Sequence, residues 1–382
     1  MRVKILTVLG LVLLLTCTWN VVVTPVASSS PSVLHVGPGY EYETIHEAVE
    51  VAEPGDTIIV HSAVYEITKT IVVDKKLNIT SDTGDYRTTG VILKGSPGWP
   101  GRVFELAAGA DGTIIRGFRF ENVKVSDTVI SSWHVDVGDI TIQSNSFINI
   151  NGPAVSRGGV FTRGWRILDN RVHNVTGEKK SGFWLSKLED VIIKGNEISN
   201  TTYAGMILDT IYGIEVSSNI IYNTPKKGVQ LANCHNALVK DNYITNTNFE
   251  GEPDEGAISI YPDCTNIRVE GNTLTGNYQG FTVRAKGGSV SSDVHVNYNN
   301  IYDNRGYGVA NFALGGGILD ARYNWWGHAS GPGGPDGRVN PAGKIVGKGD
   351  KVGSNVSWEP WLPQPVGHTP NYPVPPGLSG RP

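Results

Sequence analysis

The chain has 382 residues, a formal net charge of −4 at pH 7, 39% hydrophobic residues and 47 glycines. A chain with so little net charge lacks the basic footprint of a nucleic-acid-binding protein, and its apolar content is not that of a disordered one. We therefore expect a folded protein with no nucleic-acid partner. One elongated domain accounts for its length.

Residues 1–28 have the pattern of a targeting segment. Arg2 and Lys4 precede an apolar run from Ile5 to Val23, and small residues follow as far as Ser28. This order predicts a signal peptide that is cleaved, and hence a secreted or cell-surface protein. The alternative is an uncleaved anchor, because the run approaches the length that spans a bilayer. No other stretch is long and apolar enough, so we expect no membrane span in the mature chain.

The segment 33–75 differs from the rest. Between Tyr42 and Ala52, apolar residues recur at helical spacing, which predicts an amphipathic helix. A Pro-Gly-Asp break at 54–56 ends it, and Thr57–Val60 reads as a strand. An open stack of strands exposes its core at the end, so this helix is expected to act as a cap.

Residues 76–326 are expected to form the coils, which are irregular as far as Val137. From Ile140 to Trp326 one short phrase recurs: apolar, any, apolar, two mostly polar residues, Asn, any, apolar. Its alternation predicts a strand with one buried face, and its repetition predicts a stacked repeat. Equal positions in successive coils should form ladders of side-chain amides. The phrase asparagines are Asn145, Asn170, Asn196, Asn219, Asn242, Asn272, Asn299 and Asn324.

Two further signals accompany each phrase. Asparagine recurs four residues later, as at Asn149, Asn174 and Asn200, where a sharp corner with left-handed backbone is expected. A glycine and a short apolar strand then follow, as at Gly205 and Gly228. These features predict an all-β fold, namely a single-stranded, right-handed parallel β-helix, which is a type of solenoid. A leucine-rich repeat is the rival, but Ile and Val dominate here and no helix pattern fills the repeat.

Two segments resemble a known superfamily. The stretch from Tyr42 to Val60, with its Pro-Gly-Asp-Thr turn, and the closing stretch from Leu319 to Leu362 are similar to those of the pectate-lyase-like right-handed β-helix proteins. That superfamily includes the NosD-type group, with its carbohydrate-binding and sugar-hydrolase repeats. The resemblance covers residues 33–364, of which 327–364 form the closing segment, and it implies this fold. It implies no single activity, because members include lyases, glycosidases, epimerases, esterases and non-enzymatic surface proteins. Residues 365–382 form a Pro/Gly-rich tail.

Cys234 and Cys264 occupy equal positions in neighbouring coils. Stacked spacing falls within the Cα separation that a disulfide requires, and a secreted protein permits one. The alternative is two buried thiols that fill an apolar column.

The acidic loop 250–255 is the longest insertion at an Asn corner. Its Glu252, Asp254 and Glu255 are candidate ligands for calcium, a hard cation. The alternative is a solvated loop, with Glu255 in a surface ion pair with Lys227. Copper is disfavoured, because clusters of Met, Cys and His are lacking.

Candidate catalytic residues lie next to this loop. By the resemblance, lyases and epimerases of uronate polymers use Arg or Lys with calcium on the outer face of the Gly-led sheet, together with a base for the proton beside the carboxylate. Arg284 and Lys286 follow Asp263 by one coil and form the only compact mixed-charge group found on that face. The alternative is an interstrand salt bridge. Candidate residues for sugar binding are Trp184, Tyr203, Asp209, Tyr212 and Tyr261.

The sequence therefore supports two hypotheses. The first is a secreted β-helix protein that acts on extracellular polysaccharide as a polyuronate lyase or epimerase. The second is a non-catalytic surface protein that binds or displays glycans. In both, the expected partner is an extracellular polysaccharide or surface glycan.

Overall fold

The computed structural model describes residues 30–84, 86–87, 90–99, 101–124, 128–285, 289–313, 317–334 and 347–367. The described residues from Pro31 onwards form one compact unit. The expected signal peptide, Lys286 and positions 368–382 of the expected tail lie outside the described residues. Within the described ranges, no helix has the length and apolar character needed to cross a membrane.

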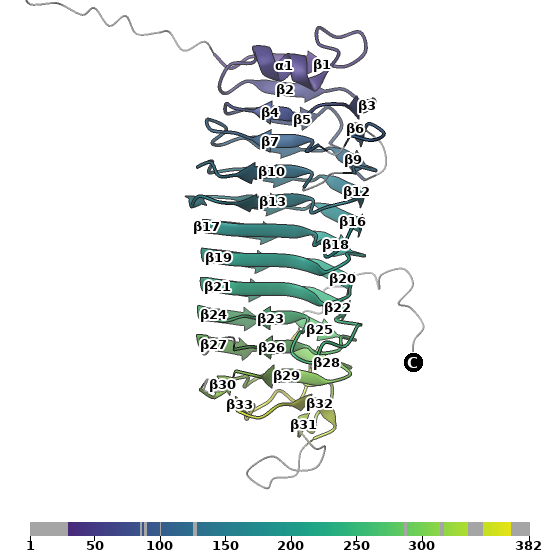
Figure 1. Cartoon of the computed structure of the whole chain (residues 1–382). Helices are drawn as coiled ribbons and strands as arrows, with labels where there is room; N and C mark the ends of the chain where they lie inside the picture. Colours follow the sequence, from purple (N-terminus) through teal and green to yellow (C-terminus); the bar gives the residue numbers. More distant parts are fainter. Residues whose placement is uncertain are drawn as a thin grey trace, which may run out of the picture. The chain divides into compact units, whose positions relative to one another are not determined.

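The unit is a stack of coils, each of which contributes one strand to each of three faces (Figure 1). Each strand pairs in parallel with its equivalent one coil away. Successive coils are therefore neighbours in the sheet, as the sequence predicted for a parallel β-helix.

The first face, here called the Gly-led face, contains β4 (Ile71–Val73), β7 (Phe104–Leu106), β10 (Ile130–Trp133), β13 (Val155–Gly158), the first parts of β17 (Phe183–Lys194), β19 (Ala204–Ser217) and β21 (Lys227–Lys240), then β23 (Ile258–Ile260), β26 (Phe281–Val283), β29 (Tyr307–Asn311) and β32 (Gly349–Val352), with β31 (Pro332–Gly333) beside it. The second face contains β1 (Val33–Val36), β2 (Thr57–Val60), β5 (Asn78–Ser81), β8 (Ile114–Arg116), β11 (Thr141–Gln143), β15 (Arg166–Leu168), the last parts of β17, β19 and β21, then β24 (Thr265–Glu270), β27 (Ser292–Asn297), β30 (Leu319–Asp320) and β33 (Val356–Ser357). The third face contains β3 (Val64–Ile67), β6 (Ile92–Gly95), β9 (Arg119–Glu121), β12 (Ser146–Ile150), β16 (Arg171–Val175), β18 (Glu197–Ser199), β20 (Ile220–Thr224), β22 (Tyr243–Thr247), β25 (Thr273–Thr275) and β28 (Asn300–Tyr302).

The first two faces belong to one sheet because β17, β19 and β21 run round the corner between them without a break. In β17 the bend uses left-handed backbone at Lys187 and Asp190. A two-residue strand, β14 (Thr162–Arg163), pairs with this bend from the preceding coil. The corner is therefore part of the hydrogen-bonded ladder rather than a free loop.

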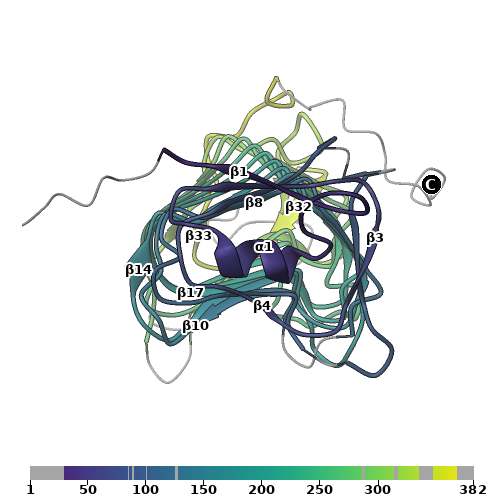
Figure 2. The same ribbon diagram turned by 90° about the horizontal axis from the view of Figure 1, so that it is seen from above.

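A short helix, α1 (Ile45–Val51), lies over the first coils (Figure 2). Thr44 caps it: its hydroxyl accepts a hydrogen bond from the Glu47 N–H, and the Glu47 carboxylate accepts one from the Thr44 N–H. Its buried residues are the apolar face that the sequence indicated, Ile45, Ala48 and Val49. The predicted strand after it is β2, with the expected bounds.

The core is a set of apolar columns inside the stack. On the second face, Ile167, Ile193, Val216 and Val239 follow one another in register and are almost completely buried. Full burial of one such side chain contributes about 1.5–3 kcal/mol. A slip of one residue would turn a whole column towards solvent, so the apolar alternation specifies the register.

The phrase asparagines form a buried ladder. The Asn196 side chain donates to Asn219 Oδ1 at 2.9 Å and to the Ile167 carbonyl at 2.8 Å, and its backbone N–H also donates to Asn219 Oδ1. All eight phrase asparagines are at most 1% exposed. The ladder begins at Phe118, which replaces asparagine and donates its backbone N–H to Asn145. The predicted amide ladder is confirmed.

The second asparagine series forms an outer ladder at the next corner. Asn149, Asn174, Asn200, Asn223 and Asn246 all have left-handed backbone, as predicted. Asn223 Nδ2 donates to Asn200 Oδ1 at 3.0 Å. A leucine-rich repeat has no such corner, so this rival is excluded.

In later coils the corner asparagine moves inward by one position. Asn277 donates its backbone N–H to Asn304 Oδ1 at 3.0 Å, and Asn304 Nδ2 donates to Asp350 at 2.6 Å. Asp350 thus takes the next place in this ladder, where an asparagine would be expected. Burial raises the pKa of its carboxyl to about 7.

Gly205 and Gly228, at the start of β19 and β21, are required by close approach of backbones. A Cβ at Gly205 would lie 2.5 Å from the Gly228 carbonyl oxygen, and one at Gly228 would lie 2.5 Å from the Ala257 carbonyl oxygen. The successive coils therefore leave no room for a side chain at this position.

Candidate functional site

The outer surface of the Gly-led face carries an aromatic platform. Trp184 is 45% exposed in β17, and its ring meets Trp133 of β10 edge to face, with centroids 6.5 Å apart and an interplanar angle of 88°. Trp133 lies over Gly158, where a Cβ would be only 2.5 Å from its ring. The missing side chain at Gly158 therefore lets the indole lie flat on β13.

Polar and small residues continue this surface towards later coils. Trp184 pairs in register with Ile207, then Gln230, Ser259 and Thr282. At about 4.8 Å per coil, the row from Trp184 to Thr282 extends for roughly 19 Å, but Ser259 and Thr282 are fully buried, so only its part from Trp184 to Gln230, roughly 10 Å long, faces solvent. Asp209 lies on the same face, where it accepts a hydrogen bond from its neighbour Thr210 at 3.2 Å.

A charged cluster forms where β21 enters this face. Lys227 Nζ is fully buried and donates to Glu255 Oε1 at 2.7 Å, to Tyr261 Oη at 2.7 Å and to Gln230 Oε1 at 3.0 Å. Arg284, directly after β26, donates to the same Glu255 oxygen at 2.6 Å. The expected surface ion pair between Lys227 and Glu255 exists, but it is buried.

Aromatic rings enclose this cluster. The Lys227 ammonium lies 5.1 Å from the Tyr203 ring centroid and 4.7 Å from that of Tyr261. The Arg284 guanidinium lies 4.6 Å from the Tyr261 ring. The structure thus brings together Tyr203, Tyr261, Glu255 and Arg284 from the predicted set and adds Lys227.

The environment shifts the pKa values of two members in opposite directions. Burial lowers the pKa of Lys227, and the neighbouring Glu255 opposes this shift. Burial also raises the pKa of Tyr261, and its hydrogen bond to Glu255 raises it further. Tyr261 therefore stays protonated at neutral pH and serves as a hydrogen-bond donor to Glu255.

Glu255 has one occupied and one free oxygen. Oε1 accepts hydrogen bonds from Lys227, Tyr261 and Arg284, whereas Oε2 is buried and has no partner among the described atoms. A buried carboxylate oxygen without a donor is uncommon in native structures. Because Oε2 is closed to solvent, a ligand hydroxyl could reach it only if the side chains around it moved.

The three predicted calcium ligands are each paired with a cationic side chain, and Asp254 and Glu255 share Arg284. Glu252 pairs with Lys226 at 2.6 Å, Asp254 with Arg284 at 2.5 Å and Glu255 with Lys227. In the part of the chain that the structure describes, no group of three or more His, Cys, Asp or Glu side chains is arranged to hold a metal ion. Calcium binding by this loop stays a prediction.

Other predicted residues lie apart from the cluster. Asp263 is exposed at the corner after β23, with left-handed backbone, and no ion pair between described residues joins it to Arg284. Lys286 lies outside the described residues. Cys234 and Cys264 are free, buried thiols, and the Cys234 N–H donates to Cys264 Sγ at 3.4 Å. The structure therefore shows two buried thiols, the alternative to the disulfide that the sequence left open.

Two members of the site were missed from sequence. Trp133 lies in a coil that lacks the repeated phrase, so its position relative to Trp184 could not be predicted from the repeat. Lys227 was seen as the neighbour of Glu255, but its burial depends on Tyr203 and Tyr261, which reach it from the adjacent coils. The one available signal was the column that Lys227 and Glu255 share, immediately before their glycines.

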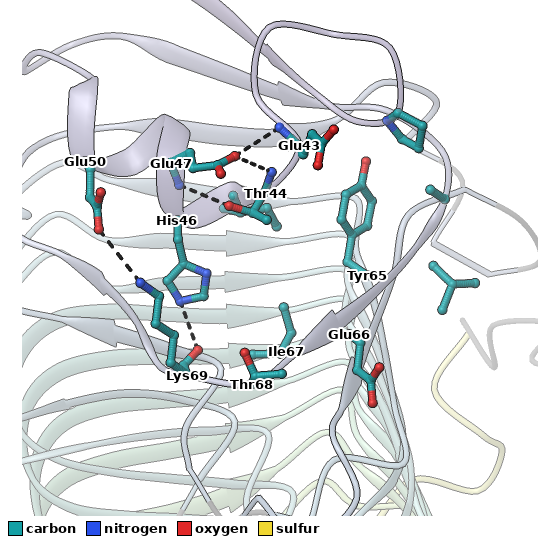
Figure 3. A pocket seen from close by; sticks show the side chains of 14 residues that line it. Glu43, Thr44, His46, Glu47, Glu50, Tyr65, Glu66, Ile67, Thr68 and Lys69 are labelled. Atoms are coloured by element: carbon teal, nitrogen blue, oxygen red, sulfur yellow. Dashed lines mark hydrogen bonds and ion pairs between the residues drawn. The ribbon is translucent and has the colours of Figure 1, made fainter.

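A cavity of about 540 Å³ lies elsewhere, between α1 and β3 at the capped end (Figure 3). Several carboxylates line it, but most already have partners. Glu47 caps the helix, Glu50 pairs with Lys69 at 3.9 Å, and Glu66 accepts a hydrogen bond from Ser96 at 2.8 Å. The cavity contains none of the predicted site residues, so we assign it to the cap rather than to the functional site.

The fold and this face define a class: a parallel β-helix with an aromatic and charged outer sheet. The family described as "Right handed beta helix region" matches residues 108–274. This match covers less than half of the chain and agrees with the coil geometry, which shows a parallel β-helix fold. No curated protein matches the chain in sequence.

Solved structures share the fold at low identity. The catalytic domain of GH87 alpha-1,3-glucanase in complex with nigerose is 14% identical, with 88% of this chain and 69% of that chain covered and a TM-score of 0.54. The same kind of domain in complex with tetrasaccharides is 14% identical, with coverage of 80% and 63% and a TM-score of 0.50. The periplasmic alginate epimerase AlgG is 14% identical, with coverage of 85% and 83% and a TM-score of 0.43. This chain thus spans less than two thirds of the second glucanase domain, and identity at this level shows the fold alone.

Proposed function

We propose that this protein binds polysaccharide outside the cell, along the Gly-led face. The observation that carries the proposal is the exposed indole of Trp184, held edge to face by Trp133 on an open sheet. Aromatic faces stack against the apolar faces of sugar rings and bring large contact area with few rotatable bonds. Although Trp133 holds one edge of Trp184, nearly half of the Trp184 residue surface remains exposed to solvent.

The rest of the face supplies what a bound glycan needs. Gln230 and Asp209 offer hydrogen-bond partners to hydroxyl groups beside the platform. The solvent-facing part of the row, from Trp184 to Gln230, is roughly 10 Å long and gives a bound glycan a contact surface that crosses three coils. These features favour a polymer as the ligand.

Binding is favoured over catalysis by the state of the charged cluster. A lyase or epimerase needs a base that can accept the proton beside the substrate carboxylate. Lys227 is buried and already bonded to Glu255, and the pKa of Tyr261 is raised, which is the wrong direction for a base. Arg284 is held by two carboxylates, so little of its charge is left for a substrate.

A polyuronate lyase or epimerase is the second candidate. It is favoured by one observation: Glu255 Oε2 has no hydrogen-bond partner, and the neighbouring Lys227 and Tyr261 have shifted pKa values. Clusters of groups with shifted pKa values are typical of catalytic sites. In this mechanism Arg284 would neutralise the substrate carboxylate with calcium bound near the acidic loop. Both candidates place the protein in contact with extracellular glycan.

The test measures binding of the protein to a panel of polysaccharides. The panel contains uronate polymers and alpha-1,3-glucan, the latter because nigerose is bound in one structure of similar fold. We expect Trp184→Ala to weaken binding by at least about tenfold, the effect of losing roughly 1.4 kcal/mol. Tyr298→Ala is the matched control, since Tyr298 is 48% exposed but lies on another corner. If Trp184→Ala binds as well as the unaltered protein, the platform is not the binding surface.

Catalysis is followed in the same samples by ultraviolet absorbance from new double bonds, with and without calcium. A rise that requires calcium and disappears in Arg284→Ala would favour the lyase. Binding without any rise would leave the non-catalytic function.

A further inference from the structure

A second recess lies at the corner where the chain passes from the Gly-led face to the second face. It encloses about 330 Å³ and is separate from the charged cluster around Lys227. The lining residues are Asp111, Asp136, Gly138, Asp139, Phe161, Thr162, Arg163 and Glu189. None of them belongs to the site described above.

An aromatic row leads out of this recess. Phe161 is 41% exposed and Tyr212 42% exposed, with ring centroids 5.9 Å apart. Tyr212 stacks on His235 of the next coil at 4.7 Å and 23°, and the two residues are in register. His235 is itself held by a 2.6 Å hydrogen bond to Thr265. The Phe161 and Tyr212 rings are tilted by 49° to each other, whereas Tyr212 and His235 are nearly parallel, and together the three rings form an aromatic row along the surface.

The backbone under the recess is firmly held. Thr162 and Arg163 pair with the bend of β17, and the Asp139 N–H donates to the Arg163 carbonyl at 2.8 Å. The Gly164 N–H donates to the Glu189 carbonyl at 2.9 Å. Because these segments belong to the ladder, Phe161 and the nearby carboxylates are presented by a rigid part of the coil.

The recess has an excess of negative charge. Four carboxylates, those of Asp111, Asp136, Asp139 and Glu189, line it together with one guanidinium, that of Arg163. No ion pair recorded between described residues involves any of these five side chains. The carboxylates therefore keep acceptor capacity for a ligand, and three of their charges are uncompensated within the recess.

We propose that this corner binds a polymer of amino sugars, with protonated ammonium groups among the carboxylates and sugar rings stacked on Phe161 and Tyr212. The charge selects a cationic ligand, and the exposed rings of Phe161 and Tyr212 favour a ligand that contains rings over a flexible chain. Uronate polymers are disfavoured here, because their carboxylates would face like charges. This site is independent of the platform around Trp184 and of the function proposed for it.

The experiment titrates the full chain with glucosamine oligomers by calorimetry at mildly acidic pH, where the amines are charged. N-acetylglucosamine oligomers and oligolysine serve as probes that lack the charge or the ring. We expect Phe161→Ala to weaken binding of the glucosamine oligomer by about tenfold or more. The double change Asp136→Asn and Glu189→Gln should weaken it similarly and reduce its salt dependence. Tyr298→Ala and Trp184→Ala should leave it unchanged.

Three results would overturn the proposal: equal binding of the acetylated oligomer, equal binding of oligolysine, or no effect of Phe161→Ala. Loss of binding in Trp184→Ala alone would also overturn it and would move the ligand to the Gly-led face. The failure of this inference is thus distinguishable from failure of the proposed function. Far-ultraviolet circular dichroism of each variant checks that the coil is intact.

Discussion

Replacement of Asn219 by alanine tests whether the buried ladder supports the stack. Asn219 Oδ1 accepts from the Asn196 backbone N–H and side chain, both at 2.9 Å, and its own side chain donates to the Ile193 carbonyl at 2.9 Å. Alanine would leave the Asn196 N–H and the Ile193 carbonyl without these partners in a site closed to water. Each stranded buried group costs about 1–3 kcal/mol, so we expect the free energy of unfolding to fall by about 3–4 kcal/mol.

Asn223→Ala is the matched control, four residues away in the same coil. Asn223 makes two amide bonds in the outer ladder, to Asn200 at 3.0 Å and from Asn246 at 2.6 Å. Water can replace these bonds because the corner is partly exposed. The left-handed backbone at Asn223 adds a cost of about 1 kcal/mol for alanine. We therefore expect a loss of about 1 kcal/mol, roughly a third of that at Asn219.

The assay is urea unfolding followed by far-ultraviolet circular dichroism, with the midpoint compared among the unaltered protein and both variants. A solenoid can lose cooperativity, so the slope of each transition must be checked before free energies are compared. If the two alanine variants unfold at the same midpoint, the buried amides contribute no more than the exposed ones, and the reasoning is refuted.

Three further predictions concern stability. The pKa of Asp350 is raised to about 7 in the folded protein. Its contribution to the free energy of unfolding is therefore complete below the unfolded pKa of roughly 4 and is lost as the pH rises through about 7. Asp350→Asn should raise the free energy of unfolding by about 1–2 kcal/mol above pH 7 and leave it unchanged near pH 4, as measured by urea midpoints. Lys227→Met should lower the free energy of unfolding by about 1–3 kcal/mol, because it leaves the buried Glu255 carboxylate without its partner. Addition of Glu255→Gln should then raise the melting temperature again. A double variant that is no more stable than Lys227→Met would contradict this reasoning. Gly228→Ala should lower the free energy of unfolding by about 3 kcal/mol, because the new Cβ would lie 2.5 Å from a carbonyl oxygen. Thermal melting measures this loss. Gly317→Ala is the control, because a Cβ there has nothing within 4 Å.

Local patterns in the chain were sufficient for the architecture. The phrase asparagines, the corner asparagines and the glycines each recur at one position of the coil, and each position imposes one physical demand. Asn219 must satisfy backbone groups in the coil interior, Asn223 must adopt left-handed backbone, and Gly228 must leave room for the next coil. Because the same residue types recur at equivalent positions in many coils, the β-helix could be predicted without a structure.

The candidate site was only partly predictable. Arg284, Tyr261 and Glu255 were expected near one another because they occupy neighbouring coils, and the structure places them in contact. The full burial of Lys227 was not expected, because it depends on how rings from adjacent coils close over the ammonium group.

By itself, the sequence determined the register of this protein, because apolar alternation and amide ladders act between equal positions of successive coils. That register specifies which residues share a face, and so it specified the surface on which Trp184, Gln230 and Arg284 lie. Only the tertiary structure decided what those residues do there. The edge contact of Trp133, the sharing of Glu255 by two cations and the pairing of Phe161 with Tyr212 depend on side-chain directions at corners and in irregular coils. Such directions follow from packing between segments whose spacing along the chain obeys no period.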